Sequence, residues 1–324
     1  MFKFKEILIN KKIKIVNINK VVLTVLFFKF LLGDIGLKLG IVFSGGGVKG
    51  IAHSGVLKAL EEENIKFDVF TGTSSGSHVA FLSAIGYSAD KIKKTYDANI
   101  NRVVGKSDIN KLSVFKDYLI SRKFKIEGLR TGEIIELFYK DIGIENGIIK
   151  INNVEKALGI VATDLLKEKE VWFTSRKIDK IYKKDIINKT DIEIGKVIRA
   201  SSSFSIMFDP CRIEEDIYLD GGICNNTPVD LARTLGADKV VAVVFEDDEN
   251  NIKKFDVNMF SIGMKTVDLM SKIISKENVY NADVVVKVKG SLKNLLDVNN
   301  SEKYYKDGYL AMKSKMNEVK KLLV

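Results

Sequence analysis

Residues 38–50 read KLGIVFSGGGVKG, and residues 67–76 read FDVFTGTSSG. In each stretch a short apolar run, typical of a buried strand, leads through glycines into a segment whose apolar residues have helical spacing. The two stretches therefore predict a β-α-β unit with a glycine-rich turn at the end of each strand. Because sites in parallel sheets form where the strands end, both turns are candidates for chemistry.

The second turn has the G-x-S-x-G spacing of a nucleophile elbow. Gly72 and Gly76 flank Ser74, and glycines relieve the crowding of a strained turn that exposes a serine at a helix N-terminus. The usual base is a histidine later in the chain, but no histidine follows His78. If Ser74 is a nucleophile, a carboxylate must accept its proton, and Asp220 is the best candidate.

The first turn also satisfies G-x-G-x-x-G, which makes a dinucleotide site an alternative. The acidic residue expected about 20 residues further on is absent, because the second strand runs into the serine turn instead. A phosphate-binding loop fits poorly, since Lys49 precedes Gly50 and no Ser or Thr follows a Gly-Lys pair. In a hydrolase, backbone N–H groups of this loop would hold the oxyanion of a tetrahedral intermediate. The candidate donors are Gly45, Gly46, Gly47 and Val48.

The length and composition fit one large α/β domain or two small ones, and we interpret the chain as one domain. The chain has 324 residues, 46% of them hydrophobic, and only 2 prolines, so no linker is visible. The net charge of +10 is concentrated in residues 1–36, which hold seven Lys against Glu6 and Asp34. We find no nucleic-acid-binding motif. The 2 cysteines lack metal-ligand spacing, which favours free thiols and fits a reducing compartment.

Residues 1–36 form an N-terminal extension to a domain spanning residues 37–324. An apolar run at 21–32 follows several lysines, like a signal peptide, but no small-x-small cleavage site follows. The run is also shorter than the roughly 20 apolar residues that span a membrane. Three interpretations stay open: a mis-assigned start near Leu37, a signal or membrane anchor, and a native peripheral extension.

Hydrophobic periodicity predicts alternating strands and helices along the rest of the chain. The predicted strands are 38–43, 67–71, 157–163, 170–174, 217–220, 239–245 and 283–288. The predicted helices are 48–62, 75–85, 88–100, 191–201, 257–275 and 301–322. This order indicates a largely parallel sheet with helices on both faces. The basic, aromatic-bearing segment 101–127 is interpreted as an exposed helix pair, with a lid or a membrane-facing surface as the alternative.

Four sequence blocks, in order and spacing, resemble bacterial patatin-like phospholipases, which are lipid acyl hydrolases with a Ser-Asp dyad. They are residues 44–50, residues 72–76, Arg199-Ala200-Ser201-Ser202, and Asp220-Gly221-Gly222 with Asn226-Thr227-Pro228. The resemblance covers residues 38–312. It implies a three-layer α/β/α fold with a mostly parallel central sheet, and direct proton transfer from Ser74 to Asp220. Residues 203–208 replace a turn that often contains proline, which leaves the acyl preference open.

The expected activity is hydrolysis of fatty-acyl esters through an acyl-enzyme, of the phospholipase A or lysophospholipase type, with neither metal nor organic cofactor. The alternatives are a general carboxylesterase or thioesterase and, in another class, a catalytically idle lipid-binding protein. His53 and His78 are interpreted as packing residues, and Lys49 as a residue that either meets an anionic head group or pairs locally. The expected partners are a lipid ester and, transiently, a membrane surface, with no nucleic acid. The expected location is the cytoplasm, with a peripheral membrane position as an alternative, or a secreted or membrane-anchored state if residues 1–36 are a true signal.

Overall fold

A mixed sheet is the centre of the fold in the computed structural model, which describes residues 36–105, 128–181, 183, 185–246, 259–289 and 300–323. The described fold belongs to one unit, Lys38–Val324. The N-terminal extension and most of the basic segment 101–127 lie outside the described residues. The strands of the sheet are β1 (Leu39–Phe43), β2 (Val69–Thr73), β4 (Ala157–Asp164), β5 (Lys169–Thr174), β6 (Ile186–Lys189), β8 (Cys211–Ile213), β9 (Asp216–Asp220), β10 (Lys239–Glu246) and β11 (Val284–Lys289). A separate pair joins β3 (Gly128–Arg130) to β7 (Ile206–Phe208).

The sheet has the strand order β11-β10-β1-β2-β4-β5-β6. Strands β11, β10, β1, β2 and β4 are all parallel, while β5 runs antiparallel to β4 and parallel to β6. The residues of β1, β2 and β4 are all buried, as expected for strands covered on both faces. The prediction of a mostly parallel sheet is therefore confirmed.

Strand β9 meets β2 end to end along one edge of β4. β2 pairs with β4 up to Thr73↔Val161, and β9 pairs with the next residue through Asp220↔Ala162. Since β5 occupies the other edge of β4, β9 must lie on the β2 edge and approach from the opposite direction. This register places the residue after Thr73, which is Ser74, level with Asp220.

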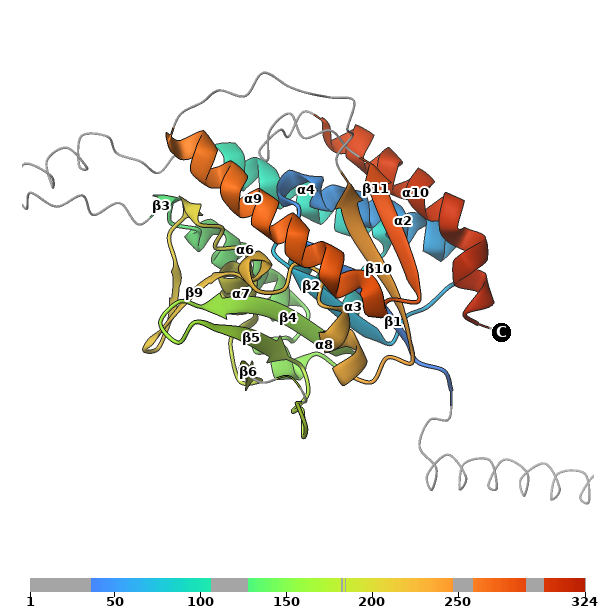
Figure 1. Cartoon of the computed structure of the whole chain (residues 1–324), viewed down its shortest axis with the longest axis horizontal. Coiled ribbons are helices and arrows are strands. Elements are labelled where there is room, and N and C mark those ends of the chain that lie inside the picture. The colour runs from blue at the N-terminus through green and yellow to red at the C-terminus, as the bar shows by residue number, and fades with distance from the viewer. Residues whose placement is uncertain are drawn as a thin grey trace, which may run out of the picture. The chain divides into compact units, whose positions relative to one another are not determined.

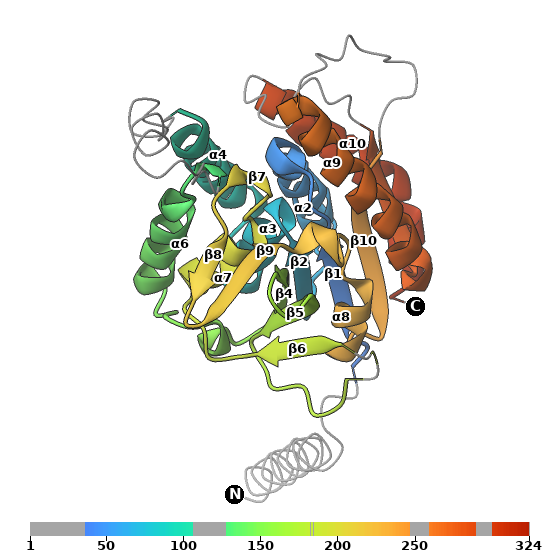
Figure 2. The ribbon, with the colours of Figure 1, turned by 60° about the vertical axis from the view of Figure 1, so that its left-hand side comes forward.

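Helices cover both faces of the sheet, which gives three layers (Figure 1). Behind it in this view lie α2 (Ala52–Glu62), α3 (Ser75–Ala84), α4 (Ala89–Gly105) and α10 (Ser301–Lys321), and in front lie α8 (Val229–Thr234) and α9 (Met259–Asn278). Figure 2 shows α4 and α6 (Glu133–Glu145) along one side and α9 with α10 along the other. Helix α7 (Ile194–Ser201) and the 3-10 turns η1 (Gly47–Ile51), η2 (Ile151–Asn153), η3 (Gly221–Ile223) and η4 (Val279–Asn281) complete the described elements.

Alternation along β1 divides the core between the two faces. Leu39, Ile41 and Phe43 point into the main cluster with α2, α3 and α10, and Val42 points into a smaller cluster with Val229 of α8. Successive side chains of a strand point to opposite faces, so one apolar strand supports both layers. None of the described helices combines the length and apolar character needed to cross a membrane.

Candidate active site

A cavity of about 930 Å³ opens where β1, β2 and β9 end. Its lining includes Ser74, Asp220 and the glycine-rich loop 44–49. One wall is apolar and consists of Ile100, Val103, Ile135, Phe204, Met207 and Phe208. The structure thus brings together the serine, the carboxylate and the glycine-rich loop, which are far apart in the sequence.

Ser74 occupies a strained turn between β2 and α3. Its backbone has φ 53° and ψ −127°, a conformation that costs an L-residue on the order of 1–3 kcal/mol. Its N–H donates to Ser201 Oγ at 2.9 Å, and Ser201 Oγ donates in turn to the Val161 carbonyl at 2.6 Å. Ser77 Oγ donates to the Ser74 carbonyl at 2.6 Å. These bonds hold the backbone, which leaves the Ser74 hydroxyl available to the cavity.

Asp220 is a buried carboxylate at the end of β9, only 2% exposed. Its Oδ1 accepts the N–H of Gly222 at 2.8 Å, so the side chain caps the turn that follows it. Its Oδ2 has no hydrogen-bond partner among the described residues. Burial raises the pKa of Asp220 to about 6, and the neighbouring Ser74 hydroxyl and the Gly222 N–H partly offset this rise. Ser74 therefore lies near the carboxylate without a fully formed hydrogen bond, and Oδ2 is free to accept a proton.

The four candidate oxyanion donors are not equivalent in the structure. The N–H of Gly45 donates to the Asn226 carbonyl at 3.2 Å, and that of Gly46 donates to Ser75 Oγ at 3.0 Å. Gly47 and Val48 begin the 3-10 turn η1, where the first N–H groups have no acceptor within the turn. Because Gly45 and Gly46 already donate to protein acceptors, Gly47 and Val48 remain the candidate oxyanion donors.

Gly76 allows helix α3 to pack closely against strand β1, which a residue with a side chain would prevent. A Cβ on Gly76 would lie 2.1 Å from the Phe43 carbonyl oxygen, so α3 approaches β1 only because this side chain is absent. A Cβ on Gly50, Gly72 or Gly221 would also lie 2.3–2.4 Å from a neighbouring atom, whereas one on Gly222 would meet nothing closer than 3.1 Å. The motif therefore reflects packing of the turns as well as backbone freedom.

A buried hydrogen-bond network holds the loop that follows Asp220. Asn225 Nδ2 donates to Glu170 Oε1 at 2.7 Å and to Asp230 Oδ1 at 2.8 Å. Trp172 Nε1 donates to the same Glu170 oxygen at 2.6 Å, and Lys183 pairs with Glu170 Oε2 at 2.6 Å. The sequence analysis missed this network, because its members come from β5, from the segment between β5 and β6, and from the loop and helix after η3.

Both histidines pack within the protein, as expected. His53 Nε2 donates to the Ser44 carbonyl at 2.9 Å, and burial lowers the pKa of His53 to about 4. His78 Nε2 lies 2.8 Å from Ser202 Oγ and its Nδ1 lies 3.3 Å from Asn99 Nδ2. With Asn99 as the donor to Nδ1, His78 donates to Ser202. Burial lowers the pKa of His78 to about 3, so both rings are neutral at physiological pH.

The remaining candidate residues are Lys49 and the two cysteines. Lys49 is 2% exposed, lines the cavity and lies 5.8 Å from the centre of the Phe245 ring. Cys211 and Cys224 are free thiols, as predicted, and burial raises the pKa of Cys211 to about 12. Within the described ranges, no group of three or more His, Cys, Asp or Glu side chains is arranged to hold a metal ion.

Comparison with known proteins finds several relatives of modest identity. Human patatin-like phospholipase domain-containing protein 6 is 28% identical over 223 residues, which are 68% of this chain and 14% of that protein. A probable lipid hydrolase of invertebrate iridescent virus 6 is 28% identical over 200 residues, 59% of this chain and 62% of that protein. The chain thus matches only a small part of the human relative.

Among solved structures, VipD from Legionella pneumophila aligns with a TM-score of 0.48 and 17% identity, covering 87% of this chain and 67% of that one. The family model described as "Patatin-like phospholipase" matches residues 41–233. This range is more than half of the chain and contains Ser74, Asp220 and the glycine-rich loop. The chain therefore belongs to the patatin-like phospholipase family.

Proposed function

We propose that this protein is a serine lipid acyl hydrolase of the phospholipase A or lysophospholipase type. The observation that carries the proposal is the pairing of Ser74, on its strained turn, with the buried Asp220, whose Oδ2 lacks a hydrogen-bond partner among the described residues. A serine is a weak nucleophile unless a base takes its proton. A carboxylate with a pKa of about 6 is mostly ionised at neutral pH, yet more basic than an ordinary aspartate.

In the acylation step, Ser74 Oγ attacks the ester carbonyl carbon while its proton passes to Asp220 Oδ2. The N–H groups of Gly47 and Val48 donate to the oxyanion that forms, which stabilises the tetrahedral intermediate. When the intermediate collapses, the bond to the alcohol breaks and the leaving oxygen takes the proton from Asp220. The fatty-acyl group is then esterified to Ser74.

In the deacylation step, water replaces the alcohol. Asp220 Oδ2 takes a proton from the water as its oxygen attacks the acyl carbonyl carbon, and the same amides hold the second oxyanion. Collapse breaks the bond to Ser74 Oγ, which recovers its proton from Asp220. The products are a free fatty acid and the starting enzyme.

The cavity supports a lipid as the substrate. Its apolar wall, which includes Ile100, Val103 and Phe208, suits an acyl chain, because burying each methylene group contributes about 0.8 kcal/mol. The relative named a probable lipid hydrolase agrees with this choice. We propose in addition that the protein acts in the cytoplasm with transient contact to a membrane surface, which fits its free thiols. A functional signal in residues 1–36 would move it elsewhere.

The test is fatty-acid release from phospholipid, lysophospholipid, neutral-ester and thioester substrates, combined with labelling by a fluorophosphonate probe. Wild type is expected to release fatty acid and to be labelled on Ser74. Ser74→Ala is expected to lose at least about a thousand-fold in rate and all labelling, and Asp220→Asn to lose a comparable factor in rate. Ser83→Ala is the matched control, because Ser83 lies in the same helix α3 but does not line the cavity.

Two results would contradict the proposal in different ways. Wild type that neither hydrolyses any of these esters nor reacts with the probe would favour a catalytically idle lipid-binding protein. Hydrolysis of short neutral esters or thioesters alone, with no release from phospholipid or lysophospholipid, would assign a general carboxylesterase or thioesterase instead.

A further inference from the structure

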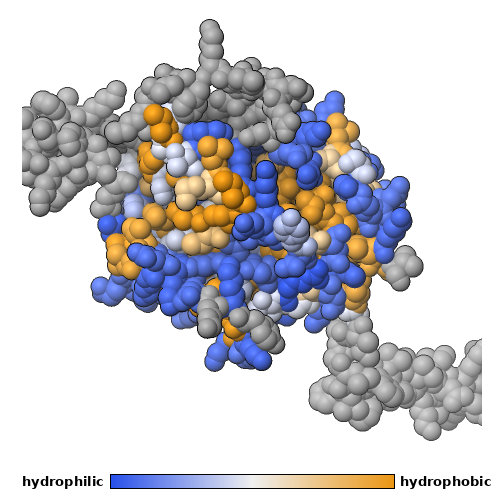
Figure 3. Space-filling view, in the orientation of Figure 1, coloured by the Kyte–Doolittle hydropathy of each residue, from blue (hydrophilic) through white to orange (hydrophobic). Residues whose placement is uncertain are grey.

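Helix α9 exposes four large apolar side chains, whereas an ordinary surface helix turns such side chains toward the core. Ile262, Leu269, Met270 and Ile273 are 47%, 49%, 51% and 61% exposed. Positions 262, 269 and 273 lie on one face of a helix, with 270 beside them. Figure 3 shows hydrophobic residues gathered over α9 among hydrophilic ones. We call these four residues the α9 stripe.

On the side away from the stripe, polar side chains of α9 contact the loop that follows Asp220. Ser275 Oγ accepts from Asn226 Nδ2 at 2.8 Å and lies 3.1 Å from Thr227 Oγ1. Asn278 Nδ2 donates to Asn225 Oδ1 at 2.7 Å. No α9 residue whose burial the structure describes is buried. These hydrogen bonds fix the side of α9 that faces the loop after Asp220.

The α9 stripe continues into the cavity that holds Ser74. Leu269 and Ile273 of the stripe line this cavity, as do Lys272 and Lys276 of the same helix. Tyr280, just beyond the end of α9, lines it too and is 87% exposed. An apolar molecule lying against the stripe would thus border the cavity mouth directly.

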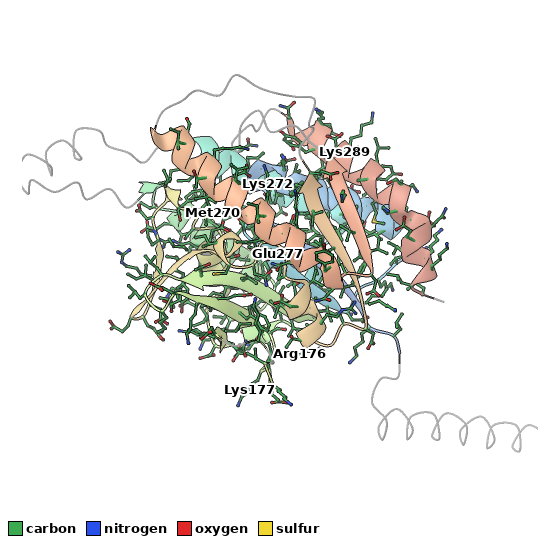
Figure 4. All side chains as sticks on the ribbon, in the orientation of Figure 1. Arg176, Lys177, Met270, Lys272, Glu277 and Lys289 are labelled. Atoms are coloured by element: carbon green, nitrogen blue, oxygen red, sulfur yellow. The ribbon has the colours of Figure 1, made fainter. Side chains whose placement is uncertain are left out.

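Lysines follow one edge of the stripe. Lys265, Lys272 and Lys276 have the spacing of a single helix face. Lys265 and Lys272 share one acidic residue, Asp268, at 3.0 and 2.7 Å, and Lys276 has no acidic partner among the described residues. Figure 4 marks Lys272 and Met270 on the same helix, with Lys289 on the nearby β11. The edge therefore carries more positive than negative charge.

We propose that the α9 stripe is the surface by which the protein docks on a lipid bilayer with anionic head groups. Apolar side chains beside lysines are the combination that binds such an interface, because the lysines attract the head groups while the apolar side chains enter the acyl boundary. A lipid in the bilayer would then lie at the mouth of the cavity. This inference rests on the proposed function, since it explains how that site would meet its substrate.

The test measures co-sedimentation with vesicles of phosphatidylcholine alone or mixed with phosphatidylglycerol. All proteins carry Ser74→Ala, so the vesicles stay intact. The parent is expected to bind mixed vesicles more tightly than neutral ones. Adding Ile262→Glu and Met270→Glu is expected to weaken binding at least about ten-fold, because two apolar side chains leave the interface. Neither Ile262 nor Met270 lines the cavity.

The matched control places the same two substitutions on another helix. Leu137 and Ile144 of α6 are 57% and 58% exposed, so Leu137→Glu with Ile144→Glu changes the charge and apolar area of the surface by a similar amount. This control is expected to bind vesicles like the parent. With Ser74 restored, both double variants are expected to hydrolyse a water-soluble short-chain ester at the wild-type rate, which shows that they fold.

The outcomes separate the docking surface from the catalytic proposal. Equal vesicle binding by the α9 variant and the control would overturn the docking surface, whether or not esters are hydrolysed. The protein could instead self-associate through the stripe and bind no vesicles, with the α9 substitutions abolishing the self-association. This result would assign the stripe to a second copy of the chain and would also overturn the bilayer docking surface. Vesicle binding that depends on the stripe, in a wild type that cleaves no ester, would uphold the docking surface and refute the proposed function.

Discussion

At the scale of the residue, the buried carboxyl of Asp220 predicts the pH dependence of the reaction. Burial raises its pKa to about 6, and only the ionised form can accept a proton from Ser74. The rate constant for ester hydrolysis is therefore expected to fall as the pH decreases through about 6. His53 and His78 have pKa values lowered to about 4 and 3, so neither accounts for a transition there.

The same pKa predicts how stability depends on pH. Because the folded-state pKa of Asp220 is raised above its ordinary value of 3.8, protonated Asp220 stabilises the fold at low pH, and this contribution is lost as the pH rises through about 6. Asp220→Asn is expected to raise the free energy of unfolding by up to about 3 kcal/mol at neutral pH and little near pH 4. Urea unfolding at both pH values measures the difference.

Asp216, at the other end of β9, is the contrasting control. It pairs with Lys167 and Lys189, and hydrogen bonds from these lysines lower its pKa. A lowered pKa stabilises the fold above the unfolded value and loses that contribution as the pH falls. Asp216→Asn should therefore destabilise the fold at neutral pH. An equal effect of both substitutions at every pH would contradict the assignment of the raised pKa to Asp220.

Motif spacing identified Ser74 and Asp220, but it did not identify their supports. The Ser201 hydroxyl accepts the Ser74 N–H. Ser201 belongs to one of the four blocks that carry the family resemblance, but the sequence did not predict its role. Ser202 and Asn99, the partners of His78, are 124 and 21 residues from it in the chain. Such contacts depend on tertiary packing, for which local sequence carries no periodic signal.

At the scale of the element, α2 and α10 cross where two glycines meet. A Cβ on Gly308 would lie 2.0 Å from the Ala52 carbonyl oxygen, and one on Gly55 would lie 1.9 Å from that of Tyr305. Gly308→Ala must push the helices apart and is expected to lower the free energy of unfolding by at least about 1–3 kcal/mol. Ser314→Ala, exposed on the same helix, should change it little. Thermal or urea unfolding of both variants checks this.

Several long elements were predicted well, and the shortest strands were missed. The helix predicted at 301–322 corresponds to α10 and the strand at 239–245 to β10. The three-residue strands β3, β7 and β8 were not predicted, because such short strands have too few residues to show alternation. The 13-residue helix α6 was also missed, and its length does not explain this. The direction of β9 was also not predicted. Asp220 does end its strand, but that strand is antiparallel to β4, so the general rule for parallel sheets does not explain its position.

At the scale of the whole molecule, the described core begins with β1. This strand pairs with β10 on one side and β2 on the other, and the Lys38 N–H donates to Asp238 Oδ2 at 2.9 Å. A protein starting at Gly36 is expected to keep the midpoint of thermal unfolding and the ester hydrolysis rate of the full chain. A protein starting at Ser44, which removes β1, should not fold. If the protein that starts at Gly36 has a lower midpoint than the full chain, or aggregates, residues before 36 support the fold.

The hydrogen bond from Trp172 to Glu170 gives the molecule an intrinsic optical probe. Trp172 is the single tryptophan of the chain and is 1% exposed. The tryptophan fluorescence of the protein therefore comes from one buried environment. The Trp172 indole shares the Glu170 carboxylate with Asn225. Asn225 lies in the loop between η3 and α8, and its Oδ1 accepts from Asn278 of α9. A shift in emission wavelength would thus report changes in this loop when an acyl chain or a lipid surface is engaged, without any attached dye.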